Sequence, residues 1–376
     1  MSEMLAAVRR LVDETVLPNV EAWDRDDVLP QSVLDELAAL GVPGALVPAA
    51  YGGRAVPVAG MVDVWRTLSQ GWISIAGAVN TTALATQLLV RYGTEAQKQR
   101  WLPGIAAGEV WASFSITEPQ AGSDLKRLQT TVEPVDDGLV ITGRKRWIAG
   151  GFSFPLACVL AKVKGEERLS CVLLPAHGRG SATWTAEPLD KLGYRGVESA
   201  TWRFDGHHVP GAEILGGEHG QGARQMLDVL AVGRVNVACR GLGVLDRALH
   251  CALAEATERE IGPGRLGDYS HTQLRLGELR ARQLVVEAAI RSAAEAIDTG
   301  AADAGERASA AKTTASESAV WAVELASRLA ASRSFTGDQE ITRLRRDAPQ
   351  TQIGEGANDA LLIAAGRTAL KRHQSG

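Results

Sequence analysis

The chain has 376 residues, of which 45% are hydrophobic and 22% are charged, and its formal net charge is −4. This is the balance of an ordinary globular protein, and the length is enough for two or three domains around a substantial core. Nothing in the composition favours nucleic-acid binding, which requires a basic face.

The N-terminus predicts a helix rather than a targeting signal. Residues 1–18 mix acidic and basic side chains along a helical stripe, whereas a secretory signal needs an uninterrupted apolar segment. No stretch of about 18 apolar residues occurs, so no membrane span is predicted.

The cysteines lie far apart in apolar segments and are interpreted as free thiols of a reducing compartment; they are Cys158, Cys171, Cys239 and Cys251. We therefore expect a cytoplasmic protein.

Residues 1–110 predict a helical domain. Apolar residues recur at helical spacing over residues 30–42 and again over residues 81–93. Thr94 is followed three residues later by Gln97, which is a capping-box pattern and predicts the start of another helix.

Residues 111–215 change to the two-residue period of strands. Asp136-Asp137-Gly138 separates two strand-like runs and predicts a hairpin. Further short strands are predicted over residues 155–163, 169–176 and 200–210. Several strands at this spacing without intervening helices indicate a small β-barrel or sandwich.

Residues 216–376 return to long helical patterns. Three of them, over residues 225–258, 272–298 and 308–332, are long enough for the helices of a bundle. The predicted fold class is therefore α+β, with an N-terminal helical domain, a middle β-barrel or sandwich domain and a C-terminal four-helix bundle.

Most local motifs favour a structural interpretation. The glycines of residues 215–224 lack the βαβ context of a dinucleotide-binding loop, so we interpret them as a turn that links domains. The seven histidines show no metal-ligand spacing, and no metal site is predicted. Residues 115–125 carry Thr117 and Ser123, which are able to bind a polar ligand, but on local grounds alone a self-stabilised turn is the better explanation.

Glu355 stands between Gly354 and Gly356, directly before a helical pattern. A carboxylate there is stabilised by the positive end of the following helix. The small neighbours would also let a ligand approach closely. The residues alone leave both roles open, a capping charge or a base that reaches into a pocket.

Residues 114–125 (FSITEPQAGSDL) and 138–151 (GLVITGRKRWIAGG) closely resemble the paired signature of the flavin-dependent acyl-CoA dehydrogenases. Further segments resemble the same family in the same order; they are residues 21–53, 91–109, 191–210 and 342–367. The resemblance covers nearly the whole chain and implies the same α+β fold.

The resemblance implies α,β-dehydrogenation of an acyl thioester, carried by CoA or by a carrier protein. A carboxylate removes the α-proton while the β-hydrogen leaves as hydride to N5 of the flavin. Glu355 matches the position of that base, and its backbone N–H is expected to help bind the thioester carbonyl. Arg234 matches an arginine near the base, although an ion pair between helices would explain it equally well. A base of this kind is expected to be desolvated, with a raised pKa.

The resemblance also implies an FAD site. Phe114, Ile116 and Thr117 match residues that meet the isoalloxazine ring, and Trp147 and Ile148 match the pair that flanks it. Two further residues match pyrophosphate contacts, Ser123 in the same subunit and Arg259 across a dimer interface.

Several positions depart from the family pattern at the cofactor. Ala149 stands where a Thr or Ser hydroxyl usually contacts flavin N5, and Gly262 stands where the segment after Arg259 usually has an aromatic residue. A partner-subunit motif aligns with Arg328, Ala331 and Ser332 instead of its Gln and glycine pair. Each missing donor would weaken binding by about 1–3 kcal/mol. We therefore expect weaker FAD binding than is usual in the family.

Two alternatives to a flavin-dependent dehydrogenase stay open. One keeps Glu355 for proton transfer or elimination on an acyl thioester without a redox step. The other is a non-catalytic subunit of a heteromeric dehydrogenase. The expected partners are an acyl thioester, copies of the same chain in a homodimer or homotetramer, and an electron-transfer flavoprotein as a possible electron acceptor.

Overall fold

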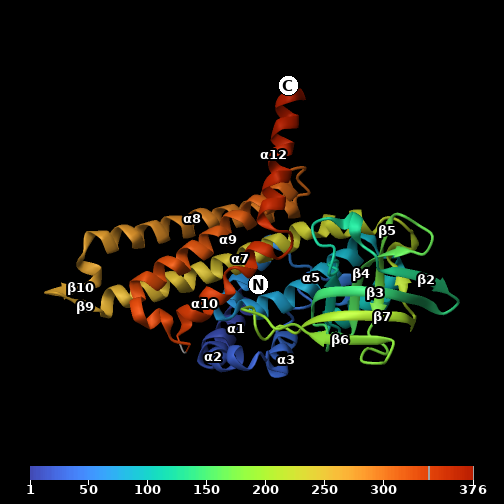
Figure 1. The fold of residues 1–376 in the computed structure, drawn as a ribbon, viewed down its shortest axis with the longest axis horizontal. Coiled ribbons are helices and arrows are strands. Elements are labelled where there is room, and N and C mark those ends of the chain that lie inside the picture. Colours follow the sequence, from blue (N-terminus) through green and yellow to red (C-terminus); the bar gives the residue numbers. More distant parts are fainter. Residues whose placement is uncertain (338, 376) are drawn as a thin grey trace.

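The computed structural model describes residues 1–337 and 339–375. Helices form the N-terminal part (Figure 1); they are α1 (Ser2–Leu11), the π-helical turn η1 (Val12–Val16), α2 (Leu17–Asp26), α3 (Gln31–Ala39), α4 (Val58–Gly71), α5 (Ile73–Tyr92) and α6 (Glu95–Ala106). The predicted capping box is confirmed, because Thr94 Oγ1 accepts from Gln97 N and the Gln97 side chain accepts from Thr94 N.

α5 is the central helix of this part of the chain. It begins at Ile73, earlier than the predicted stretch over residues 81–93, because its first half is buried all round and shows no amphipathic period. By length and composition alone it could span a membrane, but 89% of its most apolar window is buried inside the protein. It is therefore a core helix, packed against α4, α7 and β1.

Eight strands form one sheet in the order β6-β7-β3-β2-β4-β5-β8, with β1 parallel to β4. Their bounds are β1 Ala112–Ser115, β2 Thr131–Val135, β3 Gly138–Ala149, β4 Leu156–Val163, β5 Leu169–Pro175, β6 Trp184–Pro188, β7 Ser199–Pro210 and β8 Glu213–Ile214. The predicted hairpin is confirmed, with Val135 opposite Gly138. Pairing does not close between β6 and β8 in the described residues, so the domain is an open sheet and not a closed barrel.

The open sheet nevertheless encloses a core. Trp184 and Trp202, from β6 and β7, pack in one cluster with Val159 and Val172, from β4 and β5. The opposite side of β4, at Cys158 and elsewhere, packs with residues of α5 and α7. Burial on both faces explains why β4 and β5 are continuous apolar runs.

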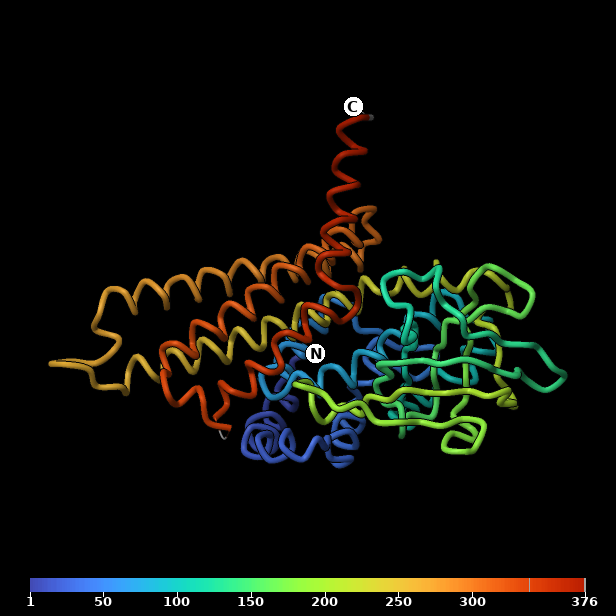
Figure 2. The backbone as a smooth tube through the Cα atoms, viewed as in Figure 1, coloured from blue at the N-terminus to red at the C-terminus, as the bar shows by residue number. Residues whose placement is uncertain are grey.

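Long helices form the C-terminal part, α7 (Gly222–Glu258), α8 (Ser270–Asp298) and α9 (Ala304–Ala330). They lie side by side, and the small hairpin of β9 (Glu260–Ile261) and β10 (Gly264–Arg265) is at the end far from the sheet (Figure 1). Shorter helices follow, α10 (Glu340–Asp347), α11 (Gln350–Ile353) and α12 (Asn358–Ser375). The tube in Figure 2 shows α12 projecting away from the body.

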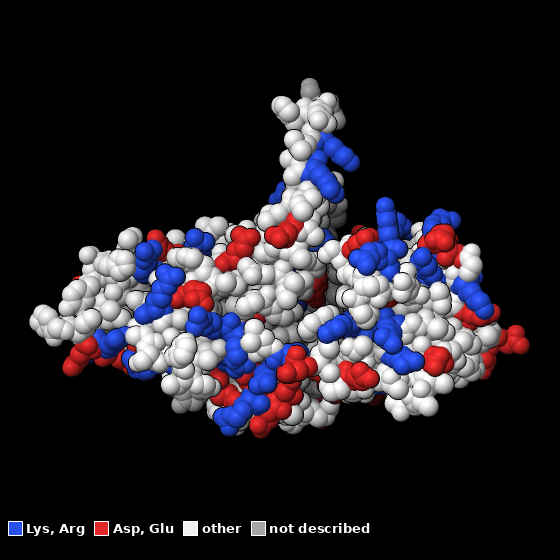
Figure 3. All heavy atoms as spheres, in the orientation of Figure 1, with Lys and Arg blue, Asp and Glu red and all other residues white. Residues whose placement is uncertain are grey.

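The changes between helices and strands fall between Ala106 and Ala112 and between Ile214 and Gly222. The turn that contains Gly216, Gly217 and Gly220 adopts positive φ at all three, as a linking turn requires. The domain limits 1–110, 111–215 and 216–376 remain our prediction. The surface in Figure 3 carries acidic and basic side chains interspersed, without a single-sign face in this view.

Candidate active site

Glu355 lies in the short loop between α11 and α12, and it carries the unusual backbone itself. Its φ is +50°, in the left-handed region, whereas Gly354 is extended at φ −60° and ψ 147°. Gly356 follows at φ +107°. A left-handed residue other than glycine costs about 1–2 kcal/mol, so surrounding contacts must hold this conformation. The strained position is therefore Glu355 itself and not Gly354 before it.

The Glu355 carboxylate points into the protein. Its Oε1 accepts a hydrogen bond from Asn80 Nδ2 of α5. Its Oε2 pairs with Arg240 Nη2 of α7 at 3.2 Å. The carboxylate thus contacts α5 and α7 and does not cap α12, which answers the question that the sequence left open. Its backbone N–H donates to no protein acceptor within residues 1–337 and 339–375.

Gly233 of α7 makes room for this side chain. A Cβ at Gly233 would lie 3.0 Å from Glu355 Cγ and 3.2 Å from Leu84 of α5. That is tighter than ordinary packing, so the absence of a side chain in α7 lets Glu355 pass between the two helices.

Arg234, the predicted neighbour of the base, contacts the same loop through its backbone. Its Nε donates to the Glu355 carbonyl oxygen at 3.3 Å, and its Nη1 donates to Ser309 Oγ at 3.4 Å. Burial lowers the pKa of Arg234, and the Glu355 charge opposes this. Arg234 therefore supports the loop, while the carboxylate itself pairs with Arg240.

Lys312 of α9 binds the loop that carries Glu355. Its Nζ donates to the carbonyls of Gln352 at 2.9 Å and Gly356 at 2.8 Å, and to Asn358 Oδ1 at 2.8 Å. Burial lowers the pKa of Lys312 to about 8, and the Glu355 charge opposes this. The three ammonium hydrogens of Lys312 thus donate to groups before and after Glu355 in the chain. These bonds hold the strained backbone of Glu355 in place.

Tyr194 covers Arg240 from the loop between β6 and β7. Its ring centroid lies 5.5 Å from Arg240 Cζ, and burial raises its pKa to about 12. A Cβ at Gly77 of α5 would overlap the Tyr194 hydroxyl, so this contact requires glycine. The backbone N–H of Tyr194, which has φ +56°, donates to Asp347 Oδ1 at 2.7 Å.

The residues predicted to meet the flavin ring come from two adjacent segments. Arg146 N donates to Thr117 O at 2.9 Å, and Ser113 Oγ donates to Ala149 O at 2.7 Å. These bonds place the segment of Phe114, Ile116 and Thr117 beside the end of β3. Ala112 N donates to Thr82 Oγ1 of α5 at 3.0 Å. Because Asn80 of the same helix binds Glu355, α5 connects this region to the Glu355 carboxylate.

Trp147 and Ile148 face opposite sides of β3. Trp147 is 55% exposed and has φ +64°. Ile148 is fully buried and packs in the core that the sheet encloses. The Trp147 ring is therefore accessible at the surface, whereas the Ile148 side chain is enclosed in the core. The cofactor roles of both residues stay predictions.

A buried ion pair that sequence reasoning missed fixes the first of these segments. Lys145 Nζ donates to Glu118 Oε1 at 2.9 Å and to the carbonyl of Ile116 at 3.1 Å. Both side chains are almost fully buried. Burial lowers the pKa of Lys145 to about 8, and Glu118 opposes this. Glu118 also accepts from the backbone N–H groups of Gln129 and Thr130.

Ser123 and Arg259 lie apart from these residues. Ser123 is exposed in the loop before η3 (Leu125–Arg127). Arg259 lies at the end of α7 farthest from the sheet (Figure 1), and its Nη1 donates to the carbonyl of Leu329 in the same chain at 2.9 Å. Within one chain Arg259 is thus remote from Glu355 and Trp147, and its pyrophosphate role remains a prediction about a second subunit.

The residues beside β1 and β3 fit a flavin. Trp147 offers an exposed aromatic surface, and Ser115 Oγ is buried without a hydrogen-bond partner in the described chain. The loop backbone at Gly122 is unobstructed, since a Cβ there would meet nothing within 4 Å. Exposed rings and open loop N–H groups suit a ring system joined to a pyrophosphate.

Sequence reasoning missed four side chains around Glu355, namely Asn80, Tyr194, Arg240 and Lys312. Polar residues within apolar helices were the available signal, because a buried polar group needs a partner. Asn80 and Arg240 interrupt apolar stretches of α5 and α7. Their common partner could not be deduced without the fold.

Three domain profiles match successive parts of the chain. Residues 2–109 match "Acyl-CoA dehydrogenase, N-terminal domain", residues 113–207 match "Acyl-CoA dehydrogenase, middle domain", and residues 220–370 match "Acyl-CoA dehydrogenase, C-terminal domain". The matches account for nearly the whole chain and follow the order of the three structural parts.

Individual proteins show the same similarity. A (2S)-methylsuccinyl-CoA dehydrogenase of Cereibacter sphaeroides is 30% identical over 369 residues, which cover 93% of this chain and 66% of that protein. A probable acyl-CoA dehydrogenase of Bacillus subtilis is 29% identical and covers 97% of this chain and 96% of its own length. The solved butyryl-CoA dehydrogenase of Megasphaera elsdenii superimposes with a TM-score of 0.92 at 25% identity, over 98% of this chain and 97% of that one.

Proposed function

This chain belongs to the acyl-CoA dehydrogenase family of oxidoreductases that act on CH–CH groups, and from this premise we propose that it dehydrogenates an acyl thioester at the α,β-position with Glu355 as the base. The observation that carries the proposal is the strained Glu355 loop. A carboxylate is held between α5 and α7, and the adjacent backbone N–H is free. The family is FAD-dependent.

Glu355 and its loop supply the proton chemistry in this proposal. The free N–H of Glu355 would donate to the thioester carbonyl and stabilise the negative charge that develops there. One carboxylate oxygen would accept the α-proton as the α C–H bond breaks. Lys312 and Arg234 hold the loop carbonyls, so the N–H and the carboxylate keep their relative positions.

FAD bound beside Trp147 and Thr117 would accept the β-hydrogen as hydride, and the electron pair of the broken α C–H bond would form the double bond. Phe114, Ile116, Thr117, Trp147 and Ile148 would hold the ring. Ser123 and, from a second subunit, Arg259 would hold the pyrophosphate. The substrate would be a CoA or carrier-protein thioester, and an electron-transfer flavoprotein is a fitting acceptor for the reduced cofactor. We propose a cytoplasmic homo-oligomer.

Replacement of Glu355 by Gln tests the base. Gln keeps the size of the side chain and loses the proton acceptor, so we expect flavin binding to persist and reduction by substrate to slow about 10²–10⁴-fold. The measurement is bleaching of the flavin absorption after rapid mixing with a panel of acyl thioesters. Glu306→Gln, an exposed change on α9, is the control that should behave like the wild type. Undiminished reduction in the Glu355→Gln variant would refute the assignment.

The colour of the purified protein tests the cofactor. A yellow protein with the visible flavin band is expected, whereas a colourless protein that cannot be reconstituted with FAD would exclude the redox reaction. In that case hydrogen exchange at the α-carbon, dependent on Glu355, would indicate non-redox proton transfer. Its absence, together with co-purification of a related chain, would indicate a non-catalytic subunit.

A further inference from the structure

Arg240 is a buried cation whose only carboxylate partner among the described residues is Glu355, the proposed base. Its side chain is 1% exposed, compared with 14% for Glu355. Arg240 therefore lies deeper in the protein than the carboxylate that would act on the α-carbon. Its Nη1 also donates to Gln350 Oε1 at 3.2 Å, and Tyr194 covers its plane. These contacts hold the guanidinium in place independently of Glu355.

The pairing in this structure conflicts with use of Glu355 as a base. Asn80 occupies Oε1 and Arg240 occupies Oε2. To accept the α-proton, one oxygen must turn from its donor toward the substrate. When Glu355 accepts the proton it also becomes neutral. Arg240 then loses its counter-charge while it stays buried, which is strongly unfavourable unless another anion takes the place.

Two further observations indicate that a ligand group completes this cluster. Arg240 Nε and Asn80 Oδ1 are buried and have no hydrogen-bond partner among the described residues. In addition, three cations surround the loop, Arg234, Arg240 and Lys312, and of these only Arg240 forms an ion pair among the described residues, with Glu355, while Arg234 and Lys312 donate to backbone carbonyls there. A neutral hydrocarbon tail would leave this excess of buried positive charge without a counter-charge.

We propose that Arg240 recognises a carboxylate at the far end of a short acyl group, so that the preferred substrate is the thioester of a dicarboxylic acid. The substrate carboxylate takes over the pairing with Arg240 Nη2 and Nε, a geometry that a guanidinium offers to planar anions. Glu355 is thereby released toward the α-carbon. Recognition of the correct acyl group and release of the base are then one event.

The length of the acyl group follows from the contact distances. A base must stand about 3–3.5 Å from the atom it deprotonates. Before the exchange, Arg240 Nη2 lies 3.2 Å from Glu355 Oε2. A carboxylate only a few bonds beyond the α-carbon therefore spans the gap, which favours short dicarboxylic acyl groups. Asn80, which keeps its donor on Glu355 Oε1, steadies the base during this exchange. This inference rests on the function proposed above.

The test compares pantetheine thioesters, because CoA and carrier proteins share that arm. Each dicarboxylic thioester is paired with the neutral thioester of equal chain length. The readouts are flavin reduction, as kcat/KM, and binding of a non-oxidisable thioester to the Glu355→Gln variant by calorimetry. For the wild type we expect kcat/KM to be at least about tenfold higher for the dicarboxylic member of a pair. The Glu355→Gln variant should bind the dicarboxylic ligand more tightly than the neutral one.

Variants of Arg240 carry the decisive comparison. Arg240→Gln should abolish the preference for dicarboxylic thioesters, and its kcat/KM for neutral thioesters should equal or exceed that of the wild type. Arg240→Lys should retain part of the preference. The matched control is Arg247→Gln, which removes an arginine of the same helix that pairs with Glu340, away from Glu355. It should keep the wild-type preference. Melting temperatures identify any variant that fails to fold, and Arg240→Lys is the second variant for that case.

Three results separate the possible failures. Wild-type protein that oxidises neutral thioesters without preferring dicarboxylic ones would overturn this inference and leave the proposed function intact. An Arg240→Gln variant whose kcat/KM falls by an equal factor for dicarboxylic and neutral thioesters would also overturn the inference and leave the proposed function intact. Arg240 would then be only a partner of Glu355. If no thioester binds or reduces the flavin, the proposed function fails and the inference fails with it.

Discussion

Single residues decide how the carboxylate of Glu355 is presented. The left-handed φ of Glu355 frees its N–H, and Lys312 fixes the carbonyls of Gln352 and Gly356 on both sides. Asp347 supports Tyr194, the residue that packs over Arg240, because Asp347 Oδ1 accepts a hydrogen bond from Tyr194 N. Burial raises the pKa of Asp347 to about 6, although Arg343 opposes this. A pKa that differs between folded and unfolded chain makes stability depend on pH.

This shift predicts the sign of one pH effect. The ordinary carboxyl pKa is about 3.9, so the folded protein binds more protons than the unfolded chain between about pH 4 and 6. The contribution of Asp347 is therefore present below about pH 4 and is lost as the pH rises through about 6. Asp347→Asn keeps the acceptor for Tyr194. Relative to this variant, the unfolding free energy of the wild type should rise by about 1–3 kcal/mol as the pH falls from 7 to 4. Urea denaturation at stepped pH measures this, and a constant difference would contradict it.

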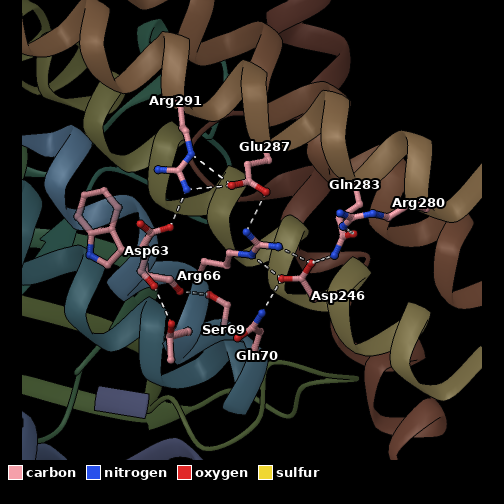
Figure 4. Close-up of polar contacts among 11 residues, drawn as sticks. Asp63, Arg66, Ser69, Gln70, Asp246, Arg280, Gln283, Glu287 and Arg291 are labelled. Carbon is pink, nitrogen blue, oxygen red and sulfur yellow. Dashed lines mark hydrogen bonds and ion pairs between the residues drawn. The ribbon is translucent and has the colours of Figure 1, made fainter. Parts of the chain in front are cut away.

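Helices are joined at the level of elements by a polar network that lies apart from the active site. Figure 4 shows Asp246 of α7 between Arg66 and Gln70 of α4 and Gln283 of α8. Arg66 also binds Glu287 of α8 at 3.0 Å. Burial would lower the pKa of Arg66, but Asp246 and Glu287 hold it above its ordinary value. The network fixes α7, the helix that carries Gly233, Arg234 and Arg240, against its neighbours.

Loss of the central carboxylate should loosen this packing. Asp246→Asn removes the charge that Arg66 binds through two nitrogens, and removal of one partner of a buried pair is costly. We expect a loss of about 2–4 kcal/mol in the free energy of unfolding, measured by urea denaturation. The control is Asp303→Asn, which breaks an exposed pair with Arg307 on α9 and should cost about 0.5 kcal/mol or less. Equal effects of the two changes would contradict a structural role for the network.

At the scale of the whole molecule, the long helix α12 stands out because it extends beyond the packed body of the protein. α12 projects from the body (Figure 2), and its apolar residues Leu362, Ile363 and Leu370 are half or more exposed. Exposed apolar residues gathered on one element favour contact with another surface. The remote position of Arg259 has the same implication, because its predicted ligand contact requires a second subunit. Both features support the proposed homo-oligomer.

The oligomer makes a prediction about α12. Lysines at Ile363 and Leu370 should weaken association, because charges would enter an apolar interface. Sedimentation velocity should show a wild-type dimer or tetramer and a larger fraction of smaller species for the double variant. Lysines at Ala6 and Ala39, exposed on α1 and α3, add the same charge elsewhere and should leave the sedimentation unchanged. A wild-type monomer at micromolar concentration would contradict the proposal.

Four features follow from the sequence alone, namely the order of the three parts, the capping box at Thr94, the hairpin at Asp136–Gly138 and the strands of the sheet core. These are local properties, because periodicity and turn chemistry act over a few neighbouring residues. The stretch around Glu355 and the signature at residues 114–125 were identified only through the family they resemble, because local patterns left their roles open.

The surroundings of Glu355 depend on how distant parts of the chain pack together. Asn80, Tyr194, Arg240 and Lys312 come from four separate elements. Whether Arg234 or Arg240 pairs with the carboxylate depends on the rotation of α7 and on the path of a loop more than a hundred residues later. The left-handed backbone of Glu355, with glycine on both sides, is set by Lys312 and not by local preference. Such contacts join residues distant in the chain, and their energies are settled by packing, which no local pattern records.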